Sequence, residues 1–120
     1  MQKELRLKKA RDFSHIYRQG RSWANDLLVL KAMPNGTDGR NRYGFSVGKR
    51  TGNAVVRNAI KRRTREAARN TPTVGGWDMI FIARRGARSA DYHRLKASVT
   101  DLLRRGRLLD ANPQSEKLQV

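Results

Sequence analysis

The sequence predicts a single α+β domain, with the order α-β-β-α-β-α and helices packed on one small mixed sheet. Three segments repeat apolar residues at helical spacing, and three shorter segments are rich in β-branched and aromatic residues. Turn residues separate these segments, and there is neither an internal repeat nor a domain linker. With 120 residues the chain can bury one modest core, expected over about 6–106, followed by a flexible polar tail over 107–120.

The first helix is expected over about 9–18. Asp12 lies in its first turn, where a carboxylate favours the positive end of the helix dipole, and Gly20 is a plausible stop just past its end. The apolar spacing of i, i+3 and i+4 is carried by Phe13, Ile16 and Tyr17. Two strands follow, over about 27–33 and 42–47. Their loop contains turn residues such as Pro34 and Gly39, which predicts an antiparallel hairpin.

The second helix covers about 52–69 and is amphipathic, with Asn53 as its expected N-cap. A strand over 77–83 is the most apolar and is predicted to be central. The last helix is expected over about 90–105. Ser89 is predicted to cap it, and its apolar stripe consists of Tyr92, Leu95, Val99, Leu102 and Leu103.

The chain is strongly basic, with 27 Lys and Arg against 10 Asp and Glu and a formal charge of +17. Such an excess indicates a polyanionic partner, most commonly nucleic acid. Anionic lipid is the other candidate, but no apolar run approaches the ~18 residues of a membrane span. The amino terminus lacks the apolar core of a signal peptide, and there is no cysteine. We therefore expect a cytoplasmic protein that does not bind a membrane.

Catalysis by the chain itself is not expected. The two histidines, His15 and His93, each lie in a predicted helix and are interpreted as surface or partly packed residues. The carboxylates are scattered, so no short motif gathers a metal site, and there is no phosphate loop or dinucleotide fingerprint. We predict no catalytic residue, no metal ligand and no cofactor required by the protein alone.

The second helix is the principal candidate for RNA binding. Its cations lie opposite an apolar face formed by Val56, Ile60, Thr64 and Ala67. Like charges at i, i+4 spacing cost stability, so a solvated cationic face explains them less well than a phosphate ligand does. Asn58 could bond a base edge or a 2′-hydroxyl, or be an ordinary surface residue. The predicted RNA-binding residues are Lys49, Arg50, Arg57, Asn58, Lys61, Arg62, Arg65 and Arg69.

Several ordered motifs resemble the bacterial ribonuclease P protein family. The most specific is the run GNAVVRNAIKR over 52–62, which is similar to the signature helix of that family. Weaker matches are LKK at 7–9, DF at 12–13, GRS at 20–22, GFSVGKR at 44–50 and IAR at 82–84. Together the motifs cover about 6–105 in order and with natural spacing.

The resemblance implies the protein subunit of a ribonucleoprotein endonuclease. In that family a catalytic RNA, with Mg²⁺, removes the 5′ leader of precursor tRNA, and the protein binds both RNAs; no protein partner is predicted. The resemblance implies a ribosomal protein S5 domain 2-like fold with a left-handed β-α-β crossover, where general rules favour a right-handed one. It also implies a leader-binding cleft lined by Phe13, Tyr17, Val29 and Lys31. From composition alone, Phe13 and Tyr17 would be core residues.

Two positions depart from the family pattern. Ala59 stands where the family usually has a third signature residue, Arg, and Lys31 stands where the family often has an aromatic residue. Two alternatives share the basic composition: a structural rRNA-binding protein of the ribosomal type, and a DNA-binding protein with the basic helix in the major groove. The first does not require the ordered motifs described above, and nothing in the sequence signals a paired half-site dimer for the second.

Overall fold

The computed structural model describes residues 6–37 and 39–110. Two short 3₁₀ helices, η2 (Lys49–Thr51) and η3 (Arg85–Ser89), precede the second and third α-helices. The other elements, in chain order, are α1 (Ala10–Gln19), β1 (Arg21–Ala24), β2 (Leu28–Pro34), β3 (Arg42–Val47), α2 (Ala54–Arg69), β4 (Trp77–Ala83) and α3 (Tyr92–Arg105). The predicted α+β class is confirmed, with one strand more than expected.

The four strands form one mixed sheet in the order β1-β2-β4-β3. β4 is central, as predicted, since it pairs antiparallel with β2 and parallel with β3. The predicted hairpin of β2 with β3 is therefore wrong. The loop after β2 instead turns toward the start of β4, where the Asn35 amide donates to the Gly76 carbonyl at 2.9 Å. β3, α2 and β4 form a parallel crossover, whose left hand stays a prediction.

Two local predictions also need correction. β1 was not expected because three of its four residues are exposed, so it has no apolar alternation to reveal it. α3 is capped by Asp91, whose side chain accepts from the Arg94 amide at 2.9 Å, and not by Ser89. Ser89 ends η3, and the chain passes through buried Ala90 before the helix begins.

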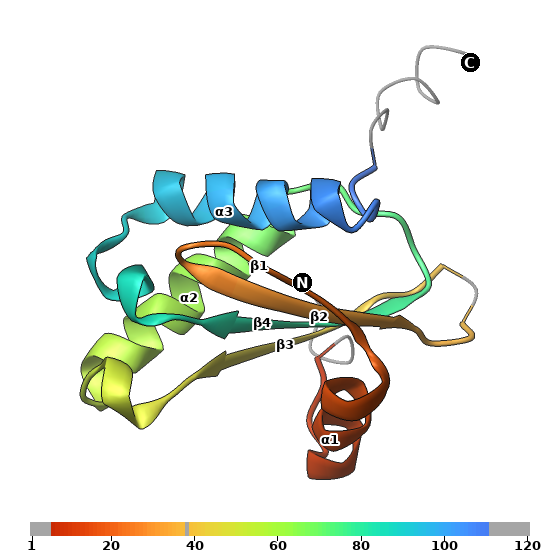
Figure 1. The fold of residues 1–120 in the computed structure, drawn as a ribbon, viewed down its shortest axis with the longest axis horizontal. Coiled ribbons are helices and arrows are strands. Elements are labelled where there is room, and N and C mark those ends of the chain that lie inside the picture. Colours follow the sequence, from red (N-terminus) through yellow and green to blue (C-terminus); the bar gives the residue numbers. More distant parts are fainter. Residues whose placement is uncertain (1–5, 38, 111–120) are drawn as a thin grey trace.

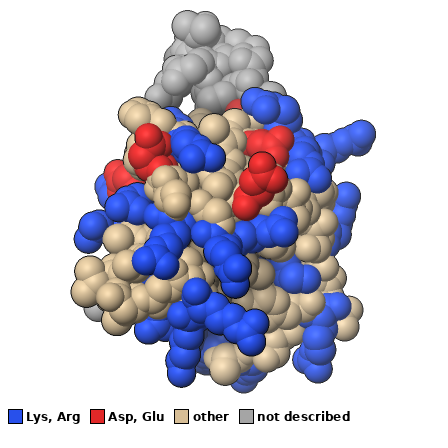
Figure 2. Space-filling view, turned by 60° about the vertical axis from the view of Figure 1, so that its left-hand side comes forward, with Lys and Arg blue, Asp and Glu red and all other residues tan. Residues whose placement is uncertain are grey.

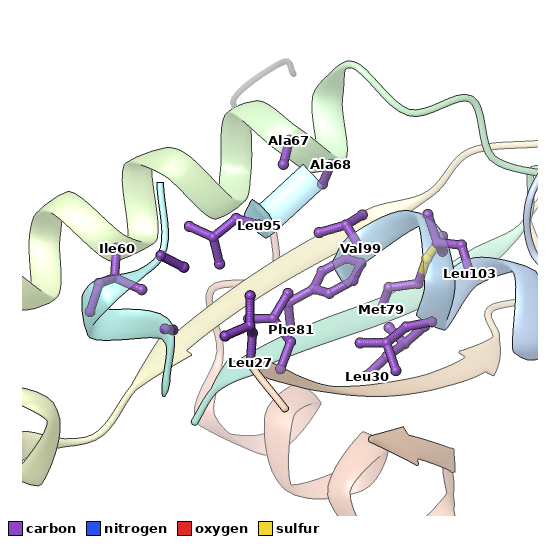
Figure 3. Close-up of a cluster of buried hydrophobic side chains, with 14 of the residues drawn as sticks. Leu27, Leu30, Ile60, Ala67, Ala68, Met79, Phe81, Leu95, Val99 and Leu103 are labelled. Atoms are coloured by element: carbon purple, nitrogen blue, oxygen red, sulfur yellow. The ribbon is translucent and has the colours of Figure 1, made fainter. Parts of the chain in front are cut away.

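The main core lies between the sheet and the helices α2 and α3, which cover the same face (Figure 1). Figure 3 shows side chains of both helices converging on those of the central strands, with Phe81 in the middle. Trp23 of β1 is partly buried and packs against this core. A Cβ placed on Gly106, just after α3, would lie only 3.1 Å from the Trp23 ring, so glycine permits this close packing.

The opposite face of the sheet is covered only in part, by α1 (Figure 1). Ile16 of α1 is 1% exposed and packs with Leu7 and Ile80 in a second, smaller cluster. The Phe13 ring lies against Gly44 of β3, where an added Cβ would be 2.7 Å from two ring carbons. A glycine at this position therefore lets α1 approach the sheet closely.

The described carboxyl-terminal residues extend the core past the predicted boundary near 106. Leu108 is buried, and its carbonyl accepts from the Val74 amide at 2.8 Å. Leu109 forms a bridge with Thr73. A flexible tail was predicted over 107–120, and residues 111–120 of it lie outside the described residues. Among the described residues, no helix has both the length and the apolar character that crossing a membrane requires.

Candidate nucleic-acid interface

The first candidate surface is the cationic side of α2. The helix begins at the predicted N-cap, because the Asn53 side chain accepts from the Val56 amide at 3.0 Å. Ile60, Thr64 and Ala67 are buried against the core, as the predicted apolar face requires, while Val56 packs against it only partly buried. Asn58, Arg62 and Arg69 are exposed, so this side of the helix offers hydrogen-bond donors and positive charge to a partner.

The two 3₁₀ helices extend this charge beyond α2. Lys49 and Arg50 of η2 are exposed, and η3 and the residue before it add Arg84, Arg85 and Arg88, also exposed. Figure 2 shows blue side chains gathered over the middle and lower part of this face, while the few acidic ones lie in its upper part. The predicted site omitted the three arginines around η3. The density of arginine over residues 84–88 is the sequence signal that points to them.

Three predicted RNA-binding residues differ from the others in burial. Arg57, Lys61 and Arg65 form an i, i+4 row that is partly buried. The Arg65 guanidinium lies over the Phe45 ring, 5.8 Å from its centre. The Nε atoms of Arg57 and Arg65 are buried and have no hydrogen-bond partner among the described residues. This row therefore presents unsatisfied donors, which the exposed cations of the same helix do not.

The second candidate surface is the part of the sheet that α1 leaves open. Strand register places Ala24, Val29, Ile82 and Ser46 in one row across β1, β2, β4 and β3. None of the four is buried, whereas Ile80 and Gly44 in the next row are buried under α1. We call this row of four residues the open strip. Lys31 belongs to the neighbouring row, on the same face as Val29.

The four predicted leader-binding residues lie on this side of the molecule but not in one cavity. Phe13 is half-buried and lines a pocket of about 270 Å³ that also contains Lys61 and Arg65. Tyr17 is 38% exposed and lines a separate hollow along α1. Neither hollow is lined by Val29 or Lys31. The structure thus offers a broad, open face with two aromatic rings, and it does not enclose the four side chains together.

An ion-pair network fixes α1 beside the open strip. Arg42 of β3 binds the buried Asp78 through two hydrogen bonds of 2.9 and 2.6 Å, and its Nη1 lies 3.7 Å from Asp12 of α1. The Asp78 hydrogen bond raises the pKa of Arg42, against the opposing effect of burial. Asn35 also donates to Asp78, at 3.1 Å. The network links the first turn of α1, next to Phe13, to the sheet.

Groups suited to acid-base or metal chemistry are not brought together by the fold. His15 and His93 are both exposed. Within residues 6–37 and 39–110, no three His, Cys, Asp or Glu side chains are close enough to share a metal ion. The exposed cations and the aromatic rings of the two candidate surfaces suit them to holding a nucleic acid by charge, hydrogen bonding and stacking.

Comparison with known proteins gives consistent results. A family model described as Ribonuclease P matches residues 1–107. The ribonuclease P protein component of Streptococcus mutans is 39% identical over 118 residues, 98% of each chain, and that of Caldanaerobacter subterraneus is 41% identical over 106 residues, 87% of this chain and 90% of its own. The ribonuclease P protein of Staphylococcus aureus superposes with a TM-score of 0.79 at 34% identity, covering 88% of this chain and 98% of that one. For the Thermotoga maritima protein the TM-score is 0.73 at 32% identity, with 83% and 96% covered.

Proposed function

This chain belongs to the ribonuclease P protein family, and we propose that it acts in that ribonucleoprotein endonuclease by positioning RNA. As a family member it is a protein subunit of the endoribonuclease that processes the 5′ ends of tRNA. We assign the cleavage itself to the RNA subunit. The chain contributes affinity and placement, which accelerate a reaction by holding the reacting groups in a productive geometry.

The catalytic RNA binds to the basic surface, which we define as the exposed and half-buried cations of η2, α2 and η3. Arginine donates forked hydrogen bonds to phosphate oxygens, and α2 contains five arginines besides Lys61. Counterion release from the RNA then drives association and makes it depend on salt. The lack of carboxylates among the exposed residues of η2 and η3 favours this assignment.

The 5′ leader of precursor tRNA lies along the open strip. The observation that carries this proposal is a row of four sheet residues, none of them buried, beside a helix with two accessible rings. A single-stranded segment needs an apolar floor and ring faces for its bases, together with nearby cations for its backbone. Lys31, in the neighbouring row, supplies charge where the family often has an aromatic residue. We therefore assign it to a leader phosphate.

The Mg²⁺ that the family uses is assigned to the RNA. The described residues contain no cluster of three metal-ligating side chains, and every role that we assign to this chain's residues is one of binding. We place this activity in the cytoplasm, where bacterial precursor tRNA is made.

Reconstitution tests the proposal directly. The purified chain would be added to a bacterial ribonuclease P RNA and precursor tRNA at low Mg²⁺, where the RNA alone is slow. We expect the chain to stimulate leader removal and to show no cleavage without the RNA. A structural rRNA-binding protein would leave the rate unchanged. Specific cleavage by the chain alone, verified to be free of RNA, would contradict the assignment of catalysis to the RNA.

A further inference from the structure

The turn between β1 and β2 is held against α3 by the Asn25 side chain. Its Oδ1 atom accepts from the Leu28 amide at 3.0 Å and from the Ser98 hydroxyl at 2.7 Å. Its Nδ2 atom donates to the Ser98 carbonyl and to the Asp101 carboxylate, both at 3.0 Å. Arg84, the residue after β4, donates to the Asn25 carbonyl at 2.8 Å. The turn, which lies under α3 in Figure 1, is therefore fixed relative to this helix.

A pocket of about 340 Å³ lies between this turn and α3. Its volume is at the lower end of the ~300–1,000 Å³ that is typical of sites for small ligands. Buried Leu27 and exposed Ala97 give the lining some apolar surface. The pocket shares no residue with the two hollows beside α1 described above. Its lining residues are Asn25, Asp26, Leu27, Arg94, Ala97 and Ser98.

Two opposite charges face this pocket without pairing. Asp26 and Arg94 both line it, and both residues are exposed. Within the described part of the chain, neither side chain forms a hydrogen bond or an ion pair, even with the other. A ligand with hydrogen-bond donors on one edge and acceptors on the next edge would satisfy both side chains at once.

The chemistry of these two side chains favours guanine. A carboxylate only accepts hydrogen bonds and repels other anions, so Asp26 disfavours a phosphate group in this pocket. Guanine has two adjacent donors, N1–H and N2–H, on its Watson–Crick edge, whereas adenine, cytosine and uracil each have an acceptor beside the donor there. Its O6 and N7 atoms accept from arginine. We propose that this pocket binds an unpaired guanine base of RNA, with Asp26 accepting from N1–H and N2–H and Arg94 donating to O6.

The arginines of η3 lie close enough to hold the RNA backbone beside that base. A Cβ placed on Gly86 of η3 would be 3.1 Å from the Asp26 carbonyl oxygen, so η3 packs directly on the turn. Arg85 and Arg88 of η3 are exposed and belong to the basic surface. Contacts with phosphate position an RNA but do not read its sequence. The proposal rests on the function proposed above, and it adds a base-specific contact to the basic surface.

Three trinucleotides that differ only in the middle base test this proposal: UGU, UIU, in which inosine lacks the N2 amino group, and UAU. Their phosphates are identical, so attraction to the basic surface cancels in the comparison. Each is titrated into the full chain at constant ionic strength, and binding is followed by nuclear magnetic resonance of the Leu27 and Ala97 amides. We expect saturable shifts with UGU. UIU should bind about tenfold more weakly, the typical effect of losing a hydrogen bond to a charged group, and UAU more weakly still.

Asp26→Asn separates a specific contact from general electrostatics, because the two predict opposite signs. Removing a carboxylate makes the chain more positive, which by itself strengthens binding of any RNA. Loss of the acceptor should instead weaken UGU binding about tenfold and bring its affinity close to that of UAU. Glu66→Gln is the matched control, since it removes one negative charge from an exposed position on α2 and should leave the ratio of UGU to UAU affinities unchanged.

Two outcomes of these titrations would overturn the proposal. One is equal affinity of the unaltered chain for UGU and UAU, and the other is stronger binding of both by Asp26→Asn. The Asp26 carboxylate has no partner among the described residues, so the variant should fold, and a melting curve verifies this. The trinucleotide titrations need no catalytic RNA, and stimulated cleavage in the reconstitution assay needs no guanine selectivity, so the two proposals can fail separately.

Kethoxal, which modifies the N1 and N2 atoms of unpaired guanine, identifies the RNA that supplies the base. It is applied to the reconstituted complex with the unaltered chain and with Asp26→Asn. We expect one guanine, in the catalytic RNA or in the precursor tRNA, to be protected by the unaltered chain and modified with the variant. Identical modification patterns in the two complexes would also overturn the proposal.

Discussion

The basic surface and the open strip are formed by different parts of the fold. The basic surface is mostly local: one helix, two short 3₁₀ turns and the residues between them, all visible as charge in the sequence. The open strip takes one residue from each of four strands, and it exists only because β4 lies between β2 and β3. In the basic surface, one cation can be replaced without changing the positions of the others. The open strip depends on the alignment of α1 with the sheet.

The largest effect is expected where that alignment is fixed. Arg42→Met would leave the buried Asp78 without its cation and release Asp12 of α1. We expect a loss of about 1–3 kcal/mol in the free energy of unfolding, the cost of leaving the buried Asp78 carboxylate without this partner, because the Arg42 side chain itself is 38% exposed. Urea denaturation measures it. Asp12→Asn is the matched control, since it breaks only the longer contact and should cost well under 1 kcal/mol. Equal losses in the two variants would mean that Asp78 does not need Arg42.

The basic surface can be weakened without unfolding the chain. Replacing Arg57, Lys61 and Arg65 by Ala removes about three phosphate contacts, which lowers the log–log salt slope of RNA binding by about 2 and weakens binding about a hundredfold near 0.1 M salt. Filter binding at several salt concentrations measures both. Replacing Lys96, Arg104 and Arg107, on or just after α3, removes the same charge away from α2. An unchanged slope in the first variant would place the RNA elsewhere.

The open strip is tested through its two rings. Replacing Phe13 and Tyr17 by Leu keeps apolar volume but removes the stacking faces. One lost stack is worth about 1–3 kcal/mol, so a substrate with a leader should bind about five- to a hundredfold more weakly. Mature tRNA, which lacks the leader, serves as the control and should bind unchanged. A large fall in melting temperature with both affinities reduced alike would instead make the rings core residues.

The smallest effect is expected at Ala59, where the family usually has Arg. Ala59 is half-buried at the edge of the α2 cations. Ala59→Arg should add one phosphate contact, which strengthens binding of the catalytic RNA about fivefold and steepens the salt slope by about 0.7. Val55→Arg, at a position 77% exposed, adds the same charge one turn earlier and shows whether position matters. Equal gains would indicate that only net charge counts.

The contrast between the two surfaces also explains what could be predicted from the sequence. The bounds of α2, its Asn53 cap and its buried face were predicted because they depend on helical spacing within one segment. The predicted pairing of β2 with β3 is wrong because turn residues between two strands indicate that the chain turns, but not which strands pair. β4 lies between β2 and β3 because it has apolar residues on both faces, and pairing along both of its edges buries it more completely than a β2–β3 hairpin would.

The pocket of about 270 Å³ that Arg6, Phe13, Lys61 and Arg65 help to line could not be predicted, for a related reason. Arg6 and Arg65 are 59 positions apart, and nothing in either local pattern indicates that Leu7 docks beside Tyr43. The same holds for Asp78, whose partner Arg42 comes from a strand that joins β4 only after the crossover through α2. The cations of η2 and α2 could be proposed as candidate site residues from the sequence, but the way in which the fold groups them with other side chains could not.

The close packing of Trp23 against Gly106 has a practical consequence for spectroscopy. Trp23 and Trp77, the chain's only two tryptophans, both pack on the side of the sheet that α2 and α3 cover. Their fluorescence emission therefore reports on whether α3 is packed against the sheet. Both rings lie on the opposite side of the sheet from α1, where bases are proposed to stack. A larger residue at 106 would push the indole of Trp23 into water and shift its emission to the red. The protein thus carries an intrinsic optical probe of folding that can be read while RNA is bound.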